Sequence, residues 1–166
     1  MKNKLSDEKK IELLKYNISR YDHYFASVNF KSSFLVLGNI TILGFVLSNR
    51  TNIYPNYIFY VLVLLITSSL LAILLAIKPY LKKYKNKDSV IFFNDISNND
   101  FEDFDKRINE LSVSIYIKDL KEQTYILAKG LQKKFYCLNI ATITFMFTIF
   151  IFFLYMGFIL KIGGIK

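Results

Sequence analysis

The chain has 166 residues, of which 53% are hydrophobic and 21% are charged, and its formal net charge is +9 at pH 7. The charged residues stand in blocks between long uncharged runs. A single water-soluble core rarely has this composition, so the sequence predicts a protein divided between lipid and water. One histidine and one cysteine exclude an intrachain disulfide and a metal site of the usual His and Cys type, which needs three or four such ligands.

Residues 1–31 are predicted to form an amphipathic helix. Ser6 is suited to cap its start, and the acids Asp7 and Glu8 follow in the first turn, where the helix dipole favours negative charge. Apolar residues then recur at spacings of three and four, which is typical of a helix face that packs on another helix. Such a stripe either packs within the chain or serves as a self-association seam; its members are Ile11, Leu14, Ile18, Tyr21, Phe25 and Val28.

Three uncharged runs are predicted to be transmembrane helices, at residues 32–48, 57–77 and 135–160. The run 57–77 has no Gly and no Pro, and as a helix of 1.5 Å per residue it extends roughly 31 Å, close to the thickness of the bilayer core. In lipid a helix satisfies its backbone hydrogen bonds internally. The polar side chains in the other two runs are expected to hydrogen-bond across helices, and these are Asn39, Asn139, Thr142, Thr144 and Thr148.

The segments between the spans are predicted to be a short loop at 49–56, a helical module at 78–134 and a tail at 161–166. Lysines 78, 82, 83, 85 and 87 form a belt with Tyr80 and Tyr84, which indicates anchoring to anionic headgroups or, alternatively, a phosphate-binding patch. Residues 88–99 are expected to be a loop or a brief extended segment. Asn99 or Asp100 then caps one helix, and a second helix with apolar spacing from Ile117 runs directly into the last span.

The distribution of positive charge predicts the orientation. In the three-span arrangement, 19 of the 22 Lys and Arg residues lie on one side, which the positive-inside rule makes the cytosolic side. The N-terminal helix and the 79–134 segment would then form a cytosolic helical module, with the loop 49–56 and the tail outside. The fold class is therefore an all-α membrane protein with three transmembrane helices. Membrane orientation explains the basicity, so no nucleic-acid polymer is expected as a partner, and no catalytic motif indicates an enzyme.

Several pieces of the chain together resemble a known family. YDHYFASVNFKSSFLVLGNITIL places a Tyr-rich helix directly before the first span, the FFNDI sequence follows the first two spans, and DLKEQTYILAKGLQKKFYCLNIA leads into the last. This order, from about Tyr16 to Phe158, resembles the transmembrane effectors of the Pycsar antiphage systems, and is similar to the related SLATT-type two-span effectors. The matching positions are Lys31, Asp95, Asp119, Gln123 and Lys134.

The resemblance implies a function as a defence effector in the bacterial inner membrane. A partner pyrimidine cyclase would make cyclic CMP or cyclic UMP after infection, and the effector would respond by forming a homo-oligomer that disrupts the membrane and arrests growth. The N-terminal stripe, Asn39 and Asn139 are the expected assembly surfaces. Two alternatives stay open: an effector of the same kind that answers to another cyclic nucleotide or dinucleotide, and a constitutive scaffold subunit that binds a protein partner.

Nothing in the sequence resembles a cyclic-nucleotide-binding β-roll, so a nucleotide pocket must be built from the helical module or between subunits. Such a pocket needs Lys or Arg for the phosphate, an aromatic face for the pyrimidine, and amide or carboxylate groups for the base and ribose. Membrane anchoring and interhelical bonding are the alternative roles for each candidate. The candidates that combine matching position or neighbourhood with suitable chemistry are Lys31, Asp95, Arg107, Gln123, Tyr125 and Lys134.

Overall fold

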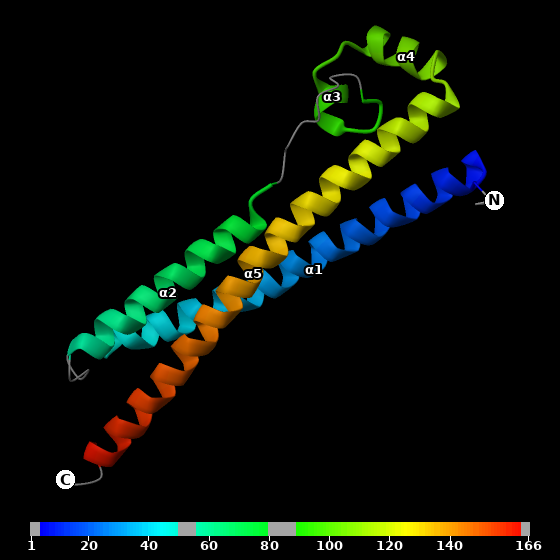
Figure 1. Cartoon of the computed structure of the whole chain (residues 1–166). Helices are drawn as coiled ribbons and strands as arrows, with labels where there is room; N and C mark the ends of the chain where they lie inside the picture. The colour runs from blue at the N-terminus through cyan, green and yellow to red at the C-terminus, as the bar shows by residue number, and fades with distance from the viewer. Residues whose placement is uncertain (1–3, 50–55, 80–88, 164–166) are drawn as a thin grey trace. The chain divides into compact units, whose positions relative to one another are not determined.

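The computed structural model describes residues 4–49, 56–79 and 89–163 (Figure 1). All regular structure within these ranges is helical, which confirms the predicted all-α class. Three of the helices, α1, α2 and α5, are long and apolar enough to cross a membrane. The elements in chain order are α1 (Asp7–Ser48), α2 (Asn56–Ile77), α3 (Phe93–Ser97), α4 (Phe101–Asn109) and α5 (Val113–Gly163).

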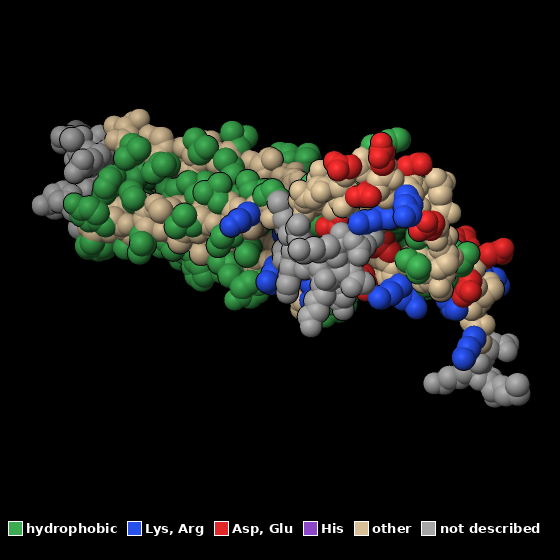
Figure 2. Space-filling view, turned by 90° about the horizontal axis from the view of Figure 1, so that it is seen from above, with side chains coloured by type: hydrophobic (Ala, Val, Ile, Leu, Met, Phe, Trp, Pro, Cys, Tyr) green, Lys and Arg blue, Asp and Glu red, His purple; other side chains and the backbone are tan. Residues whose placement is uncertain are grey.

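The helices form two compact units. The polar unit contains Met1–Phe25 and Pro79–Gln132, and the membrane unit contains Ala26–Lys78 and Lys133–Lys166. On the face seen in Figure 2, hydrophobic side chains gather over the membrane unit, whereas Asp and Glu side chains and most of the Lys and Arg side chains gather over the polar unit. Many large apolar side chains are exposed on this unit, among them Leu64, which is 69% exposed. A continuous apolar surface of this kind is unfavourable in water, so it is suited to contact with lipid acyl chains.

The predicted boundaries near residues 31 and 134 fall inside continuous helices. α1 and α5 each run from one unit into the other without a break, so the change in composition at these positions marks a change of surroundings and not the end of a helix. The predicted loop around Pro55 and the belt lysines 82, 83, 85 and 87 lie outside the described residues. In the tail, α5 continues to Gly163.

The membrane unit packs with a period of seven residues. Such a 3.5-residue repeat keeps one seam of each helix facing its neighbours, as in coiled coils. The contacts gather in two clusters, one of Val46, Leu62 and Tyr155 and one of Ala72, Ile73 and Ala141. The buried residues that the structure describes in this unit are Val28, Ser32, Asn39 and Val46 on α1, Leu62, Ile66, Ser69, Ala72, Ile73 and Ala76 on α2, and Lys134, Leu138, Ala141, Thr148 and Tyr155 on α5.

A hydrogen-bonded chain joins the three helices of the membrane unit. The Nδ2 atom of Asn39 donates to Ser69 Oγ at 3.0 Å, and Ser69 Oγ donates to the carbonyl oxygen of Ala141 at 3.1 Å. This confirms the predicted interhelical role of Asn39.

The same prediction was wrong for the threonines of α5. Thr142, Thr144 and Thr148 each donate to a carbonyl oxygen three or four residues earlier in their own helix. A Thr hydroxyl reaches this carbonyl without any partner helix, and this local bond is the one that forms. The side chain of Asn139 is exposed and has no hydrogen-bond partner among the described residues.

The structure agrees with the predicted start and apolar stripe of the N-terminal helix. Ser6 Oγ accepts the backbone N–H of Lys9 at 3.4 Å, and α1 begins at the next residue after Ser6. The predicted apolar stripe is half-buried from Ile11 to Phe25 in the polar unit and fully buried at Val28, which belongs to the membrane unit, so it packs within the chain. Asp100 stands at the N-cap position of α4, as predicted, although its side chain makes no capping hydrogen bond.

The expectation of a loop or extended segment at 88–99 was incomplete, because one short helix forms there. The backbone N–H groups of Asp95 and Ile96 donate to the carbonyl oxygen of Phe92 and close the turn that becomes α3. The hydroxyl of Ser89 accepts the N–H groups of Ile91 and Phe92, which fixes the chain just before that turn. The hydroxyl thus orders the chain that leads into α3, although the helix itself has no side-chain capping hydrogen bond.

Candidate functional site

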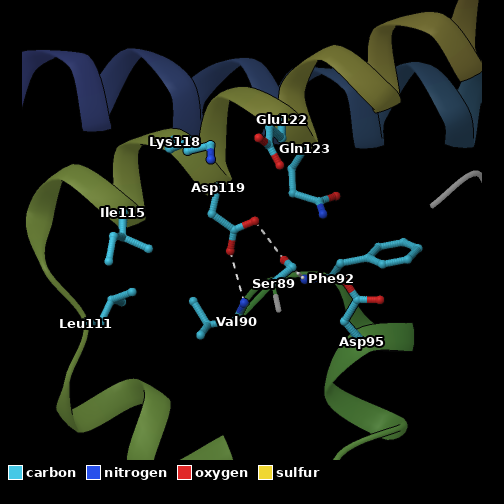
Figure 3. A pocket seen from close by; sticks show the side chains of 10 residues that line it. All are labelled: Ser89, Val90, Phe92, Asp95, Leu111, Ile115, Lys118, Asp119, Glu122 and Gln123. Carbon is cyan, nitrogen blue, oxygen red and sulfur yellow. Dashed lines mark hydrogen bonds between the residues drawn. The ribbon is translucent and has the colours of Figure 1, made fainter. Parts of the chain in front are cut away.

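The polar unit contains a cavity of about 350 Å³ between the segment 89–95 and one face of α5 (Figure 3). This volume lies within the range of small-molecule sites in proteins. The α5 side of the cavity is made by residues three and four apart, which lie above one another on a helix face. Its polar lining consists of Ser89, Asp95, Lys118, Asp119, Glu122 and Gln123.

Asp119 holds the segment 89–92 against α5. Its carboxylate accepts the hydroxyl of Ser89 at 2.7 Å and the backbone N–H of Val90 at 3.0 Å. Asp119 is 9% exposed, and hydrogen bonds to a charged acceptor are stronger than those between neutral groups. One side chain of α5 thus positions the wall of the cavity that leads into α3.

Two further polar side chains are buried at the cavity without a partner. Asp95 on α3 is 6% exposed and Gln123 on α5 is 7% exposed, and both line the cavity (Figure 3). Within the described part of the chain neither side chain has a hydrogen-bond partner. The polar atoms of these two side chains are not fully enclosed by the protein and reach the open volume of the cavity. They are polar groups that the protein leaves unpaired along this cavity.

The charge of the cavity is unbalanced. Its lining includes three carboxyl groups, from Asp95, Asp119 and Glu122, and one ammonium group, from Lys118. Lys118 is therefore the position on this lining where a single anionic group is best placed. Phe92, half-buried in the same lining, adds an aromatic face.

The structure brings together two of the six candidate residues chosen from the sequence, Asp95 and Gln123, which are 28 positions apart. Asp119, a matching position of the resemblance, joins them. Sequence reasoning did not select Ser89, Lys118 or Glu122. The signal that could have found the last two is helical spacing: Glu122 follows Lys118 by four residues and stands beside Gln123 on the same helix.

The other four candidates do not line this cavity. Tyr125 is 58% exposed, with Lys129 Nζ lying 5.8 Å from its ring centroid, and Arg107 is half-buried on α4. Lys31 is exposed on α1.

Lys134 has a structural contact instead. Its Nζ atom is buried and donates to the carbonyl oxygen of Ala76 at 2.6 Å. This carbonyl belongs to the last turn of α2, where backbone acceptors lack helical partners and where positive charge is favoured by the helix dipole. Lys134 therefore caps the C-terminal end of α2.

The described residues place no group of three or more His, Cys, Asp or Glu side chains so that it could hold a metal ion. The three carboxyl groups at the cavity thus do not form a metal-binding cluster in this structure.

The comparisons with known proteins agree with the membrane architecture. A family model described as the Pycsar effector protein domain matches residues 13–161, which is most of the chain. Comparison with curated proteins and comparison with solved structures each gave no match. The chain thus combines three helices able to span a membrane with a family match that covers both units, and it belongs to the Pycsar effector family of antiphage defence proteins.

Proposed function

We propose that the chain senses a cyclic pyrimidine mononucleotide, cyclic CMP or cyclic UMP, in the cavity of the polar unit. Binding drives formation of a homo-oligomer that disrupts the bacterial inner membrane and arrests growth of the infected cell. The observation that carries the proposal is the cavity itself, where the nearly buried residues Asp95 and Gln123 present polar atoms without a protein partner, in a chain that belongs to this family.

The lining supplies one group for each part of such a ligand. Lys118 is suited to the single phosphate, Phe92 to the flat face of the pyrimidine, and Asp95 with Gln123 to the hydrogen-bonding edge of the base. The volume of about 350 Å³ favours a mononucleotide over a cyclic dinucleotide, which contains two nucleotides and needs about twice the space.

We propose that ligand binding in the cavity is coupled to the membrane unit through α5. α5 carries Lys118, Asp119 and Gln123 and continues without a break into an apolar span. A ligand that binds the oligomer more tightly than the single chain shifts the population toward the oligomer. The size of this shift is set by the difference between the two binding affinities. No covalent chemistry is needed for this role, so the ligand acts as a signal and not as a substrate.

We also propose an orientation of the chain in the membrane. With 19 of the 22 Lys and Arg residues on one side of the three spans, the N-terminus and the polar unit face the cytosol, where a cyclase product would accumulate.

Purified full-length protein in dye-loaded liposomes tests the proposal. Cyclic CMP, cyclic UMP and a cyclic dinucleotide are added in turn, while dye release and oligomer size are measured. We expect release with a pyrimidine mononucleotide. Gln123→Leu should need at least about tenfold more ligand, because it removes the amide that the base would satisfy. Gln132→Leu, which changes an exposed amide of the same helix, is the matched control and should behave like the wild type.

Two outcomes would contradict the proposal. If no nucleotide causes release or a change of oligomer size, the chain is not gated in this way, and a protein partner that co-purifies would favour the scaffold alternative. If only the dinucleotide acts, the assignment of the ligand is wrong.

A further inference from the structure

The hydrogen-bonding groups around the cavity are unequally divided between acceptors and donors, and this bears on which base the cavity takes. We infer that the cavity selects cytosine over uracil and that Asp95 is the residue that determines this choice. The inference rests on the proposed function, since it concerns the ligand of the same cavity.

Acceptors dominate the lining. The carboxylates of Asp95 and Glu122 can only accept hydrogen bonds when ionised. The hydroxyl hydrogen of Ser89 is already donated to Asp119, so this hydroxyl offers the cavity no donor. The donors that remain in the lining are the ammonium group of Lys118 and the amide of Gln123. A ligand that fills this cavity well must therefore bring hydrogen-bond donors of its own.

The positions of the charged groups set the direction of the ligand. Lys118 and Asp95 lie on opposite sides of the lining in Figure 3, with Asp119 between them. A phosphate placed beside Asp95 would set two negative charges together, whereas beside Lys118 it meets its counter-charge. With the phosphate at Lys118, the base extends toward Asp95 and Gln123.

The two pyrimidines differ where they would meet these side chains. Cytosine carries an amino group, a donor, at the position where uracil carries a carbonyl oxygen, an acceptor. Gln123 can pair with either base, because a half-turn of its amide exchanges donor and acceptor. Asp95 has no such freedom: it accepts from the amino group of cytosine, but against uracil it meets a carbonyl oxygen. The ring N–H of uracil is no equal substitute, since carbonyl oxygens flank it on both sides.

The expected preference is large enough to measure. A hydrogen bond to a charged acceptor, or its loss with the acceptor left buried, corresponds to about ten- to a hundredfold in affinity. Cyclic CMP should therefore bind at least about tenfold more tightly than cyclic UMP.

Calorimetric titration of the full-length protein in detergent micelles provides the test. Three ligands are compared: cyclic CMP, cyclic UMP, and cyclic CMP whose two amino hydrogens are replaced by methyl groups. The methylated ligand should bind as weakly as cyclic UMP or more weakly. Asp95→Asn should reduce the preference to within about threefold or reverse it, because an amide can donate to the uracil carbonyl. Asp103→Asn, an exposed change on α4, should leave the preference intact.

Equal affinity of the wild type for cyclic CMP and cyclic UMP would overturn the inference and leave the proposed function standing. The same holds if the methylated ligand binds as well as cyclic CMP, a result that does not depend on how any variant folds. If neither mononucleotide binds, the inference and the proposed ligand fall together.

Discussion

The two units of the molecule differ in the surroundings of their buried polar residues. In the membrane unit, Asn39, Ser69 and the carbonyl of Ala141 form one hydrogen-bonded chain across three helices, inside a tightly packed seam. In the polar unit, Asp95 and Gln123 are buried to nearly the same degree as that seam but face a cavity without a partner. The polar atoms of Asp95 and Gln123 reach the open volume of the cavity, whereas Asn39 Oδ1 and the Tyr155 hydroxyl are fully enclosed by the packed helices. The membrane unit is thus closely packed around its polar groups, and the polar unit contains the open volume in which we propose that a ligand binds.

The two units also differ in how many contacts determine their arrangement. Heptad packing spreads the stability of the membrane unit over many side chains along three helices. In the polar unit, the cavity wall at 89–92 depends on the carboxylate of a single residue, Asp119. Local change should therefore be easier to produce in the polar unit, which suits a segment that responds to binding.

The largest expected effect is at this carboxylate. Asp119→Ala leaves the half-buried Ser89 hydroxyl and the Val90 N–H without their acceptor and should cost about 3 kcal/mol in the local stability of the cavity wall. Hydrogen exchange of the peptide 89–97 should rise, while peptides of α2 keep their protection. Asp103→Ala on exposed α4 is the control. Unchanged exchange at 89–97 would show that Asp119 does not hold this wall.

A smaller effect is expected from close packing in the membrane unit. A Cβ atom added to Gly38 would lie 2.5 Å from Cζ of Phe145, whereas one added to Gly44 meets nothing within 4 Å. Gly38→Ala should therefore lower stability by about 2 kcal/mol through overpacking, and Gly44→Ala should not. Thermal unfolding in detergent, followed by far-UV circular dichroism, separates the two. Equal melting temperatures for both variants would contradict the close packing of α1 on α5.

The smallest effect is expected from the interhelical hydroxyl. Ser69→Ala removes the interhelical acceptor of Asn39, which keeps its bond to the Leu35 carbonyl, and the donor to Ala141; interhelical hydrogen bonds in membranes contribute only about 1 kcal/mol each. Its neighbour Ser68 donates to Leu65 in its own helix, so Ser68→Ala is a matched control that should change little. The same unfolding measurement applies. If Ser69→Ala lowered stability as much as Asp119→Ala is expected to, the stability of the membrane unit would not be spread over many side chains, and the contrast between the two units would be wrong.

Much of the fold could be predicted because it depends on local patterns. The run 57–77 had to be a span, since its composition leaves no face for water, and α2 ends at Ile77 as predicted. Ser6 with the acids after it predicted the start of α1, because a cap uses groups within the next three residues. The apolar stripe from Ile11 to Val28 predicted a buried face, because helix period and spacing decide which residues share a side.

The site could be predicted only in part, because its geometry depends on contacts between distant segments. The sequence selected Asp95 and Gln123 by resemblance, but nothing local indicates that the segment 89–92 lies on α5. That docking is fixed by Asp119, which binds residues 29 and 30 positions earlier. For the same reason the threonines of α5 were misjudged, since choice between an intrahelical carbonyl and a neighbouring helix depends on which groups the fold brings within reach. Sequence periodicity alone determined the helices and their membrane character, whereas the tertiary structure decided which polar groups meet, because hydrogen bonds require distances that no linear spacing specifies.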